Sequence, residues 1–338
     1  MKDILRNNAV KPKPRVLALS GGVGGAKLAL GLYRILDPWD LAVVVNTGDD
    51  FEHFGLHISP DVDTLMYTLS GENNTELGWG RADEGWAFLK QLKRLGGETW
   101  FQLGDGDLAV HVQRTESLKR DETLSSITAK LFLRMGIDAQ VWPMSDQPVF
   151  TMVDTVDGRE LPFQNYFVQE RCEPKVSGFR FLGAKTAKPN SSFMKCLADP
   201  TLDAVIVCPS NPFVSIDPIL AIPGVRVALK ACPAPVIAVS PIVDSEAIKG
   251  PTAKMMRELD IPVNPLSVAR HYADFLDGFI LDDADVHHAG SLEVPTLVTG
   301  TVMKTLEDRD ALARDALSFA QRLKADAALS PAPAMGAS

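Results

Sequence analysis

Four aspartates lie within nineteen residues of this sequence, in the segment NTGDDFEHFGLHISPDVDT (46–64). If Asp49, Asp50, Asp61 and Asp63 lay close together, their like charges would repel one another unless a cation held them. Carboxylate oxygens are the ligands that Mg²⁺ prefers, and a protein-bound Mg²⁺ often bridges to the phosphates of a substrate. Capping of a following helix accounts for one or two of these acids but not for all of them. The segment therefore predicts a site for a metal ion or a substrate hydroxyl group.

A glycine-rich turn, SGGVGGAK (20–27), precedes the acidic segment and joins an apolar run to a helical pattern. Backbone amides of such a turn bind phosphate at a helix N-terminus, because the unpaired N–H groups and the helix dipole point the same way. The spacing matches neither the P-loop nor the dinucleotide-binding fingerprint, and a tight connection alone would also use glycine. We expect phosphate contacts from Gly21, Gly22, Gly24, Gly25 and Lys27.

Three further polar loops follow apolar runs later in the chain: QLGDGDLAVHVQRT (102–115), PMSDQP (143–148) and CPSNPFVSIDPIL (208–220). Proline fixes the shape of such loops, while serine and asparagine offer neutral hydrogen bonds to base, sugar or phosphate. GDGD could equally be a simple turn. The loops add as candidate ligand contacts Asp105, Ser145, Asp146, Ser210, Asn211 and Ser215, with Arg114, Lys249 and Lys254 as candidate cations.

The residue types that would support other chemistries do not occur in the required patterns. No Ser–His–acid or Cys–His arrangement accompanies these loops, and the four cysteines lack the spacing of a disulfide framework or a zinc site. The loops agree with one another in offering amides, carboxylates, neutral donors and a few cations. This combination favours a nucleoside-diphosphate substrate bound together with a divalent metal ion.

Strands and helices that alternate along the chain must position these loops. Segment 148–182 is an exception, because its β-branched and polar residues alternate around a DG turn, as in an antiparallel hairpin. The pattern predicts a Rossmann-like α/β fold: a doubly wound, mainly parallel sheet with a small antiparallel insertion, which binds ligands beyond the carboxyl ends of its strands. Strands are expected at 15–20, 40–46, 279–285 and 295–300, with a strand leading into a loop at 203–212 and at 234–243 and a strand-like run from Trp100. Helices are expected at 26–36, 63–70, 84–95, 124–137, 249–261 and 305–324.

Length and composition fit a single domain in a chain of 338 residues, of which 46% are hydrophobic. We expect a disordered leader at 1–14, one domain at 15–325 and a flexible tail at 326–338. The net charge of −9 argues against a nucleic-acid partner. No apolar stretch is long enough for a membrane span, and the N-terminus lacks the pattern of a secretory signal. These features predict a cytoplasmic protein with reduced thiols, and apolar helix surfaces are compatible with a homodimer.

Together, these motifs resemble those of the 2-phospho-L-lactate transferase family, in the same order and over about residues 15–285. The likeness is carried by LSGGVGGAKLALGL, VVVNTGDDFEHFGLHISPDVDTLMYTLSG, LGDGDLAVHVQRT, PMSDQPV and PSNPFVSIDPIL. The SPDVDT, PMSD and PSNP elements are specific in combination. The family acts in the biosynthesis of the deazaflavin coenzyme F-420, so the resemblance implies the same role for this chain.

The resemblance implies a definite reaction. The ribityl hydroxyl of the deazaflavin precursor Fo would attack a guanosine-diphospho-linked three-carbon acid and release GMP, with Mg²⁺ spanning the diphosphate. The group transferred is 2-phospholactyl, enolpyruvyl-phosphate or 3-phosphoglyceryl, and the sequence does not choose among them. Asp50 and Asp63 would act in catalysis and, with Asp49, in metal binding, while Gln102 would lie along Fo. The glycine-rich turn and the loop at 209–215 would hold the guanosine diphosphate.

One motif departs from the family pattern, because this chain has GDGD where the family has GDRD. Gly106 therefore stands where an arginine is expected. A missing guanidinium would weaken an anion contact, for which Arg114 or Lys130 are the candidates to compensate. The alternative function is a non-catalytic regulatory protein of the same fold that binds a nucleotide sugar. The acids of SPDVDT and the PMSD loop favour the enzyme, since a binding module has no evident use for a metal-and-hydroxyl site.

Overall fold

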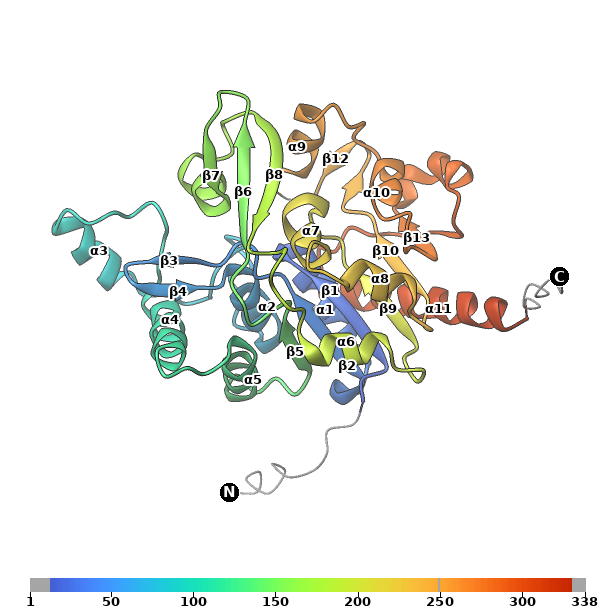
Figure 1. Ribbon diagram of the computed structural model, residues 1–338, viewed down its shortest axis with the longest axis horizontal. Coiled ribbons are helices and arrows are strands. Elements are labelled where there is room, and N and C mark those ends of the chain that lie inside the picture. Colours follow the sequence, from blue (N-terminus) through green and yellow to red (C-terminus); the bar gives the residue numbers. More distant parts are fainter. Residues whose placement is uncertain (1–12, 249, 330–338) are drawn as a thin grey trace, which may run out of the picture.

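The computed structural model describes residues 13–248 and 250–329. At its centre is a parallel sheet with the strand order β14-β13-β10-β9-β1-β2-β5 (Figure 1). This confirms the predicted fold class. The strands of this sheet are β1 (Val16–Ser20), β2 (Leu41–Val45), β5 (Gln140–Pro143), β9 (Ala204–Val207), β10 (Val236–Val239), β13 (Gly278–Leu281) and β14 (Thr296–Val298).

The central strands are buried on both faces, and their side chains alternate between two hydrophobic cores. In β1, Leu17 and Leu19 join one core and Ala18 the other. In β2, Val44 and Val43 divide in the same way. This period of two explains why the runs read as continuously apolar in the sequence: a parallel strand covered by helices needs no polar face.

Helices cover both faces of the sheet (Figure 1). One core contains apolar side chains of α1 (Gly22–Ile35), α2 (Pro60–Ser70), α5 (Leu124–Arg134) and α11 (Leu306–Leu329). The other core contains those of α6 (Ser191–Leu197), the π-helix η4 (Pro212–Ile216), α7 (Asp217–Leu220), α8 (Val225–Lys230), α9 (Thr252–Glu258) and α10 (Pro265–His271). Two 3-10 helices, η2 (Pro38–Asp40) and η5 (Asp283–Ser291), lie in connections.

The strand order places a topological switch point between β1 and β9. From β1 the chain proceeds outward through β2 to β5, and it then returns to β9 on the other side of β1 before it proceeds through β10 and β13 to β14. Loops that leave β1 and β9 therefore diverge at the carboxyl edge of the sheet. In open parallel sheets this divergence opens the crevice in which ligands bind.

The predicted antiparallel insertion is confirmed. It forms a three-stranded sheet of β6 (Phe150–Thr155), β7 (Glu160–Pro162) and β8 (Val176–Leu182), with the π-helix η3 (Asn165–Gln169) following β7. A smaller two-stranded sheet, β11 (Ile242–Val243) and β12 (Glu246–Ala247), follows β10. Figure 1 shows the insertion standing above the carboxyl edge of the central sheet.

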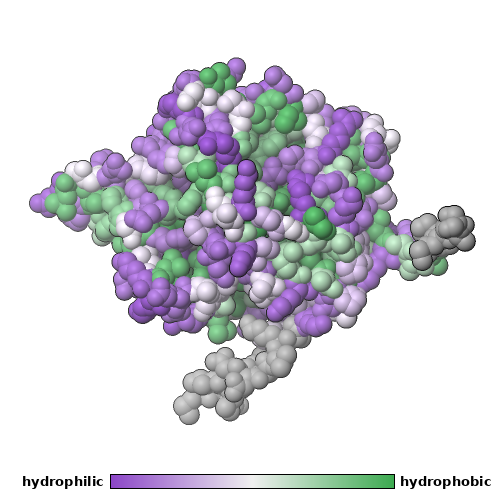
Figure 2. Space-filling view, viewed as in Figure 1, coloured by the Kyte–Doolittle hydropathy of each residue, from purple (hydrophilic) through white to green (hydrophobic). Residues whose placement is uncertain are grey.

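A second projection, which the sequence did not predict, extends from the side of the sheet (Figure 1). It contains the hairpin β3 (Phe51–His53) and β4 (Leu56–Ile58), a long connection, and α3 (Ala87–Arg94). We call residues 51–101 the lobe. Apolar side chains are exposed on it, as the space-filling view also shows (Figure 2); they include Phe54, Leu77, Trp79, Trp86 and Leu95.

Several predicted boundaries were wrong. The strand-like run from Trp100 is irregular and leads into α4 (Asp105–Leu118), and β5 was missed. The helix predicted from Asp63 begins at Pro60, and α11 continues to Leu329, into the predicted tail. The rest of that tail, residues 1–12 of the predicted leader, and Lys249 lie outside the described residues. No helix in the described part of the chain has the length and apolar character to cross a membrane.

Candidate active site

A cleft of ≈ 690 Å³ opens at the switch point, beyond the carboxyl ends of β1 and β9. Its floor comes from the glycine-rich turn and from the loop after β9. One wall comes from the lobe and α4, and the insertion and the segment after β10 supply the others. The polar residues predicted for the site that line this cleft are Gly21, Gly22, Gly24, Lys27, Asp49, Asp63, Gln102, Ser210, Asn211 and Ser215.

The glycine-rich turn is packed directly against the loop that follows β9. The hydroxyl of Ser210 donates to the carbonyl oxygen of Gly21 (2.8 Å) and accepts from its amide (3.2 Å). Helix α1 then begins at Gly22 with no side-chain cap and no acid in its first turn. An uncapped helix N-terminus that faces a cleft presents unpaired N–H groups to an anion. The predicted phosphate cradle is therefore compatible with this geometry.

The close packing explains why one position in this turn is glycine. A Cβ on Gly24 would overlap the carbonyl oxygen of Pro209, a backbone atom that cannot move alone. We expect Gly24→Ala to displace the turn and to weaken binding of guanosine diphosphate at least about tenfold, since it separates backbone donors from their ligand. Calorimetric titration with GDP would measure this. Gly290→Ala is the matched control, because a Cβ there meets no atom within 4 Å; equal GDP affinity in both variants would contradict the packing argument.

Two of the four aspartates converge on one amide. The side-chain Nδ2 of Asn46, directly after β2, donates to Oδ1 of Asp49, to Oδ2 of Asp61 (2.9 Å) and to the carbonyl oxygen of Val214 (3.2 Å). Asn46 Oδ1 accepts the amide of Gly48 (2.7 Å), which fixes the orientation of its amide group. The end of β2, the start of α2 and the loop after β9 thus meet at one residue.

Burial makes ionisation of both carboxylates of this pair unfavourable. Burial, followed by the neighbouring charges of Asp61 and Asp50, raises the pKa of Asp49 well above its usual value. Burial also raises the pKa of Asp61 to about 6, against the opposing hydrogen bonds from Asn46 and Gly22. Like charges removed from water are costly unless a proton or a cation binds. An all-oxygen donor set that lines a cleft fits a hard divalent cation such as Mg²⁺.

The other two aspartates are held by partners of their own. Asp50 accepts hydrogen bonds at Oδ2 from the Ser59 hydroxyl (2.7 Å) and from His57 Nε2 (3.0 Å), while its Oδ1 is buried and has no partner among the described residues. Asp63 receives both terminal nitrogens of Arg114, one at 3.1 Å and the other in a shorter contact. The four acids thus divide into the pair that shares Asn46 and two acids with partners of their own, of which Asp63 also lines the cleft.

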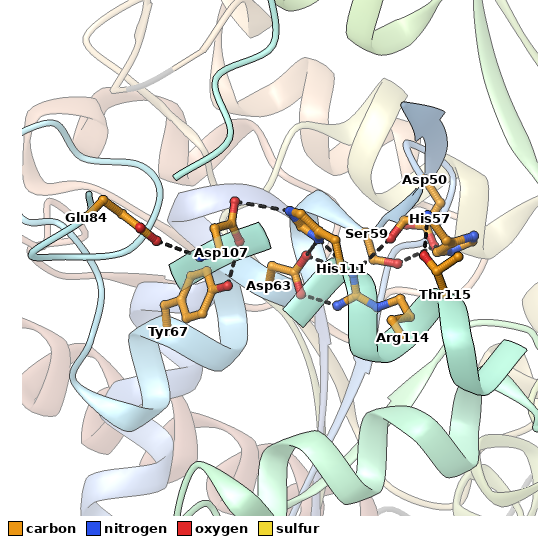
Figure 3. Close-up of polar contacts among 10 residues, drawn as sticks. All are labelled: Asp50, His57, Ser59, Asp63, Tyr67, Glu84, Asp107, His111, Arg114 and Thr115. Carbon is orange, nitrogen blue, oxygen red and sulfur yellow. Dashed lines mark hydrogen bonds and ion pairs between the residues drawn. The ribbon is translucent and has the colours of Figure 1, made fainter. Parts of the chain in front are cut away.

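Asp107 extends the polar network along the cleft wall (Figure 3). Its Oδ1 accepts the Tyr67 hydroxyl (2.6 Å), and its Oδ2 lies 3.1 Å from Nε2 of His111. Arg114 approaches the other ring nitrogen of His111 (3.3 Å). Burial opposes ionisation of Asp107, but the contacts with His111 and Tyr67 outweigh it and hold its pKa below the usual value. Asp107 therefore presents an ionised carboxylate to the cleft.

Five predicted site residues lie outside the cleft, and four of them have evident structural partners. The Asp105 carboxylate accepts the first amides of α3, Ala87 N (3.0 Å) and Phe88 N (2.9 Å). The Asp146 carboxylate accepts an amide at the start of α5 (2.7 Å), and the Ser145 hydroxyl donates to the carbonyl of Lys188 (2.8 Å). The others are Asp50 and Gly25, and no cleft contact supports a ligand role for any of the five.

The sequence reasoning missed residues that do line the cleft. Asp61 belongs to the acidic segment and Asp107 to GDGD, but spacing alone did not separate them from Asp50 and Asp105. Aromatic side chains from two projections also face the cleft and carried no recognisable motif: Trp79, Trp100, Phe101, Phe163 and Phe167. Lys27 lines the cleft as predicted, where its ammonium donates to the carbonyl oxygen of Met303 (2.7 Å).

Comparison with known families decides what kind of site this is. Residues 16–298 match the family model described as 2-phospho-L-lactate transferase CofD. The chain belongs to the CofD family. This agrees with the resemblance found in the sequence motifs, and it makes the chain a transferase. The alternative of a non-catalytic regulator that binds a nucleotide sugar is not favoured.

Individual CofD relatives extend over nearly the whole chain. A phosphoenolpyruvate transferase from Kitasatospora aureofaciens is 38% identical over 319 residues, covering 92% of this chain and 99% of the relative. A 2-phospho-L-lactate transferase from Methanocaldococcus jannaschii is 36% identical over 307 residues, covering 90% and 97%. A crystal structure of a UPF0052-family protein from Bacillus halodurans has a TM-score of 0.61 at 14% identity, over 90% of this chain and 99% of that one. It supports the fold alone.

Proposed function

We propose that this CofD-family chain transfers a phospho-three-carbon-acid group from a guanosine-diphospho-linked donor to the ribityl hydroxyl of Fo, with release of GMP, in F-420 biosynthesis. The observation that carries the proposal is the cleft at the switch point, where the uncapped N-terminus of α1 lies beside the buried pair Asp49 and Asp61. Amide donors suit a diphosphate, and paired carboxylates suit the cation that accompanies it. The relatives from Kitasatospora aureofaciens and Methanocaldococcus jannaschii are named as a phosphoenolpyruvate transferase and a 2-phospho-L-lactate transferase, which supports the proposal.

We infer that Asp49 and Asp61 would hold a Mg²⁺ ion in this cleft. Their raised pKa values and shared contact with Asn46 support them as a pair that a bound cation would stabilise. When bound, Mg²⁺ supplies charge neutralisation of the donor diphosphate. Asp63 fits the ligand role predicted for it less well, because Arg114 already occupies both of its oxygens.

In this type of reaction the protein acts mainly by positioning the two substrates and by stabilising the charge of the transition state. A bond forms between the acceptor oxygen and the phosphorus that carries the three-carbon acid. The bond from that phosphorus to the oxygen of the departing GMP breaks, and the hydroxyl proton passes to a carboxylate of the cleft. The turn at Gly21–Gly24 and the loop that contains Ser210, Asn211 and Ser215 would hold the diphosphate in line with the incoming hydroxyl.

The aromatic walls support a planar acceptor. Phe163 and Phe167 are stacked with ring centroids 5.4 Å apart, and Trp100 and Phe101 face the cleft from the lobe. A tricyclic deazaflavin buries a large apolar face, and offset stacking on aromatic rings stabilises it further. Gln102 follows Phe101 in the chain and also lines the cleft, which supports a hydrogen bond from its amide to the same ligand.

The test is direct. We expect purified protein with Mg²⁺, Fo and the correct one of the three guanylylated acids to release one GMP per Fo-containing product, followed by mass spectrometry. Omission of Mg²⁺ with added EDTA should lower the rate at least ~10²-fold, because the diphosphate charge is then unscreened. No GMP with any donor would refute the proposal, as would GMP release that does not require Fo. Binding of a UDP-sugar without turnover would support the regulator instead.

We also propose a cytoplasmic location. The thiols support it, since all four cysteines lie among the described residues and are free. Burial raises the pKa of Cys196 and of Cys208 to about 12 in each case, which makes both thiols poor nucleophiles. Unpaired cysteines persist in a reducing compartment.

A further inference from the structure

An arginine is expected at position 106 from the family pattern, but the residue there is glycine. The space that its side chain would use is filled by the side chain of Arg81. A Cβ built on Gly106 would overlap Nη1 of Arg81 and would lie 3.2 Å from its Cζ. The same Cβ would lie 3.2 Å from Oε1 of Glu84. The guanidinium of Arg81 therefore lies directly over the first turn of α4, in the space that a side chain at position 106 would use.

The sequence suggested Arg114 or Lys130 as a replacement for the missing arginine, but neither side chain reaches the space beside Gly106. Arg114 is committed to Asp63 on the inner side of α4. The ammonium of Lys130 pairs with Glu122 on an exposed surface. Arg81 had no motif to mark it, because it follows a glycine-rich stretch of the lobe and lies 25 positions before Gly106 in the chain.

The lobe and α4 cap each other at the same point. The Glu84 carboxylate accepts the amides of Gly106 and Asp107, both at 2.7 Å, at the start of α4. In the other direction, the Asp105 carboxylate accepts the first amides of α3. Figure 3 shows Glu84 at the outer end of the network that reaches Asp107, Asp63 and Arg114. Each helix N-terminus thus receives a carboxylate from the other segment, which satisfies orphan amides on both sides.

Arg81 joins this contact to the loop that forms part of the cleft wall. We call residues 72–82 the Trp79 loop. Its two ends are held together by the amide of Ala82, which donates to the carbonyl of Glu72 (2.7 Å), and by Nε of Arg81, which donates to the Glu72 carboxylate (2.8 Å). Its tip, Leu77–Gly80, lines the cleft. The guanidinium therefore lies between the base of this loop and the start of α4.

We propose that Arg81 is a positioning residue for the acceptor: its guanidinium, lying over Gly106, holds the Trp79 loop against α4 as one wall of the acceptor part of the cleft. This rests on the proposed function for the identity of the acceptor, Fo. A side chain at position 106 would displace the guanidinium of Arg81, so glycine there leaves this space to Arg81. The positive charge also lies between Glu72 and Glu84, and so it neutralises two acids that would otherwise repel each other across the contact.

The proposal predicts that an arginine side chain supplied by α4 can replace the one that the lobe supplies. Arg81→Gln removes it, and Gly106→Arg supplies one from α4 to the same space. The Gly106→Arg change alone meets only the flexible end of the Arg81 side chain, which can swing toward solvent because this side chain is 34% exposed. The double variant should therefore recover what the single Arg81→Gln variant loses.

The experiment compares Arg81→Gln, Gly106→Arg and the double variant in the complete chain. We expect Arg81→Gln to raise the KM for Fo on the order of tenfold, because a small displacement of a binding wall is costly, while kcat and the donor KM stay within about twofold. The double variant should return the Fo KM to within about threefold of the wild-type value. Arg159→Gln is the matched control, an exposed arginine that pairs with Asp157 and Glu170 on the insertion.

A second readout needs no turnover. Trp79, Trp86 and Trp100 all lie in the lobe, so acrylamide quenching of tryptophan fluorescence reports whether the loop has loosened. We expect stronger quenching in Arg81→Gln and wild-type quenching in the double variant. Unchanged Fo KM and quenching in Arg81→Gln would overturn the proposal, as would a folded double variant as impaired as Arg81→Gln. If wild-type protein turned over no donor, the proposed function would fail, and the quenching series would still decide whether Arg81 holds the loop.

Discussion

Asp61→Asn is expected to lower transferase turnover by about 10²- to 10³-fold, the range found when one group that stabilises transition-state charge is removed. The physical reason is its place in the cleft, where its carboxylate faces Asp49 across the amide of Asn46. Asparagine keeps the size of the side chain and can still accept from Asn46, but it brings no charge to a divalent cation. Steady-state rates of GMP release at saturating Mg²⁺ would measure the loss.

The same substitution should not destabilise the metal-free protein. Removing one of two buried like charges relieves repulsion, and burial already raises the pKa of Asp61 to about 6. We therefore expect the urea midpoint of metal-free Asp61→Asn to equal or exceed that of the wild type. Asp285→Asn is the control: Asp285 is also buried, but it accepts the amide of Asp244 and is not among the residues that line the cleft, so its turnover should be unchanged. Wild-type turnover in Asp61→Asn would remove this residue from the mechanism.

Asp63→Asn is expected to act chiefly on stability, with a loss of about 3–5 kcal/mol in the free energy of unfolding. Losses of that size follow when one partner of a buried ion pair is removed. Arg114 is fully buried, and its terminal nitrogens both bind Asp63. Neutralising Asp63 would leave that guanidinium buried without its counter-charge. This differs from the expectation drawn from the sequence, in which Asp63 acts in catalysis and in metal binding.

A double-mutant cycle separates the pair from its surroundings. Urea unfolding of Asp63→Asn, Arg114→Gln and the double variant would measure the coupling. We expect the double variant to be more stable than Asp63→Asn, because it buries no uncompensated charge. An unfolding free energy for Asp63→Asn within about 1 kcal/mol of the wild-type value would show that the pair contributes little.

The two aspartates illustrate how far spacing can identify a site. Both stand in SPDVDT, two positions apart at the start of α2, and their side chains point in different directions because successive helical residues are about 100° apart. Asp61 therefore faces the glycine-rich turn, and Asp63 faces Arg114 on α4. Which of the two pairs with Arg114 and which lies beside the glycine-rich turn depends on the neighbours that α2 acquires only in the folded chain.

The GDGD motif at the start of α4 is a second case in which spacing alone does not identify the residue that faces the cleft. Its two aspartates are both in the first turn of α4, where either could cap the helix or face a ligand. Asp105 turns outward to the amides of α3, while Asp107 turns inward to Tyr67 and the cleft. The position of α3 was not predictable, since the lobe has no motif and its packing against α4 is a tertiary contact.

The doubly wound sheet, the glycine-rich turn after the first strand, the acidic segment after the second strand and the family were all predictable from the order of the amino acids alone. These are local features: strand burial, turn chemistry and motif order are written in consecutive residues. Only the tertiary structure decided which carboxylates share the cleft, that Arg114 neutralises Asp63, and that Arg81 lies over Gly106. Those outcomes depend on contacts between segments far apart in the chain, and their geometry is fixed by packing, which no local pattern encodes.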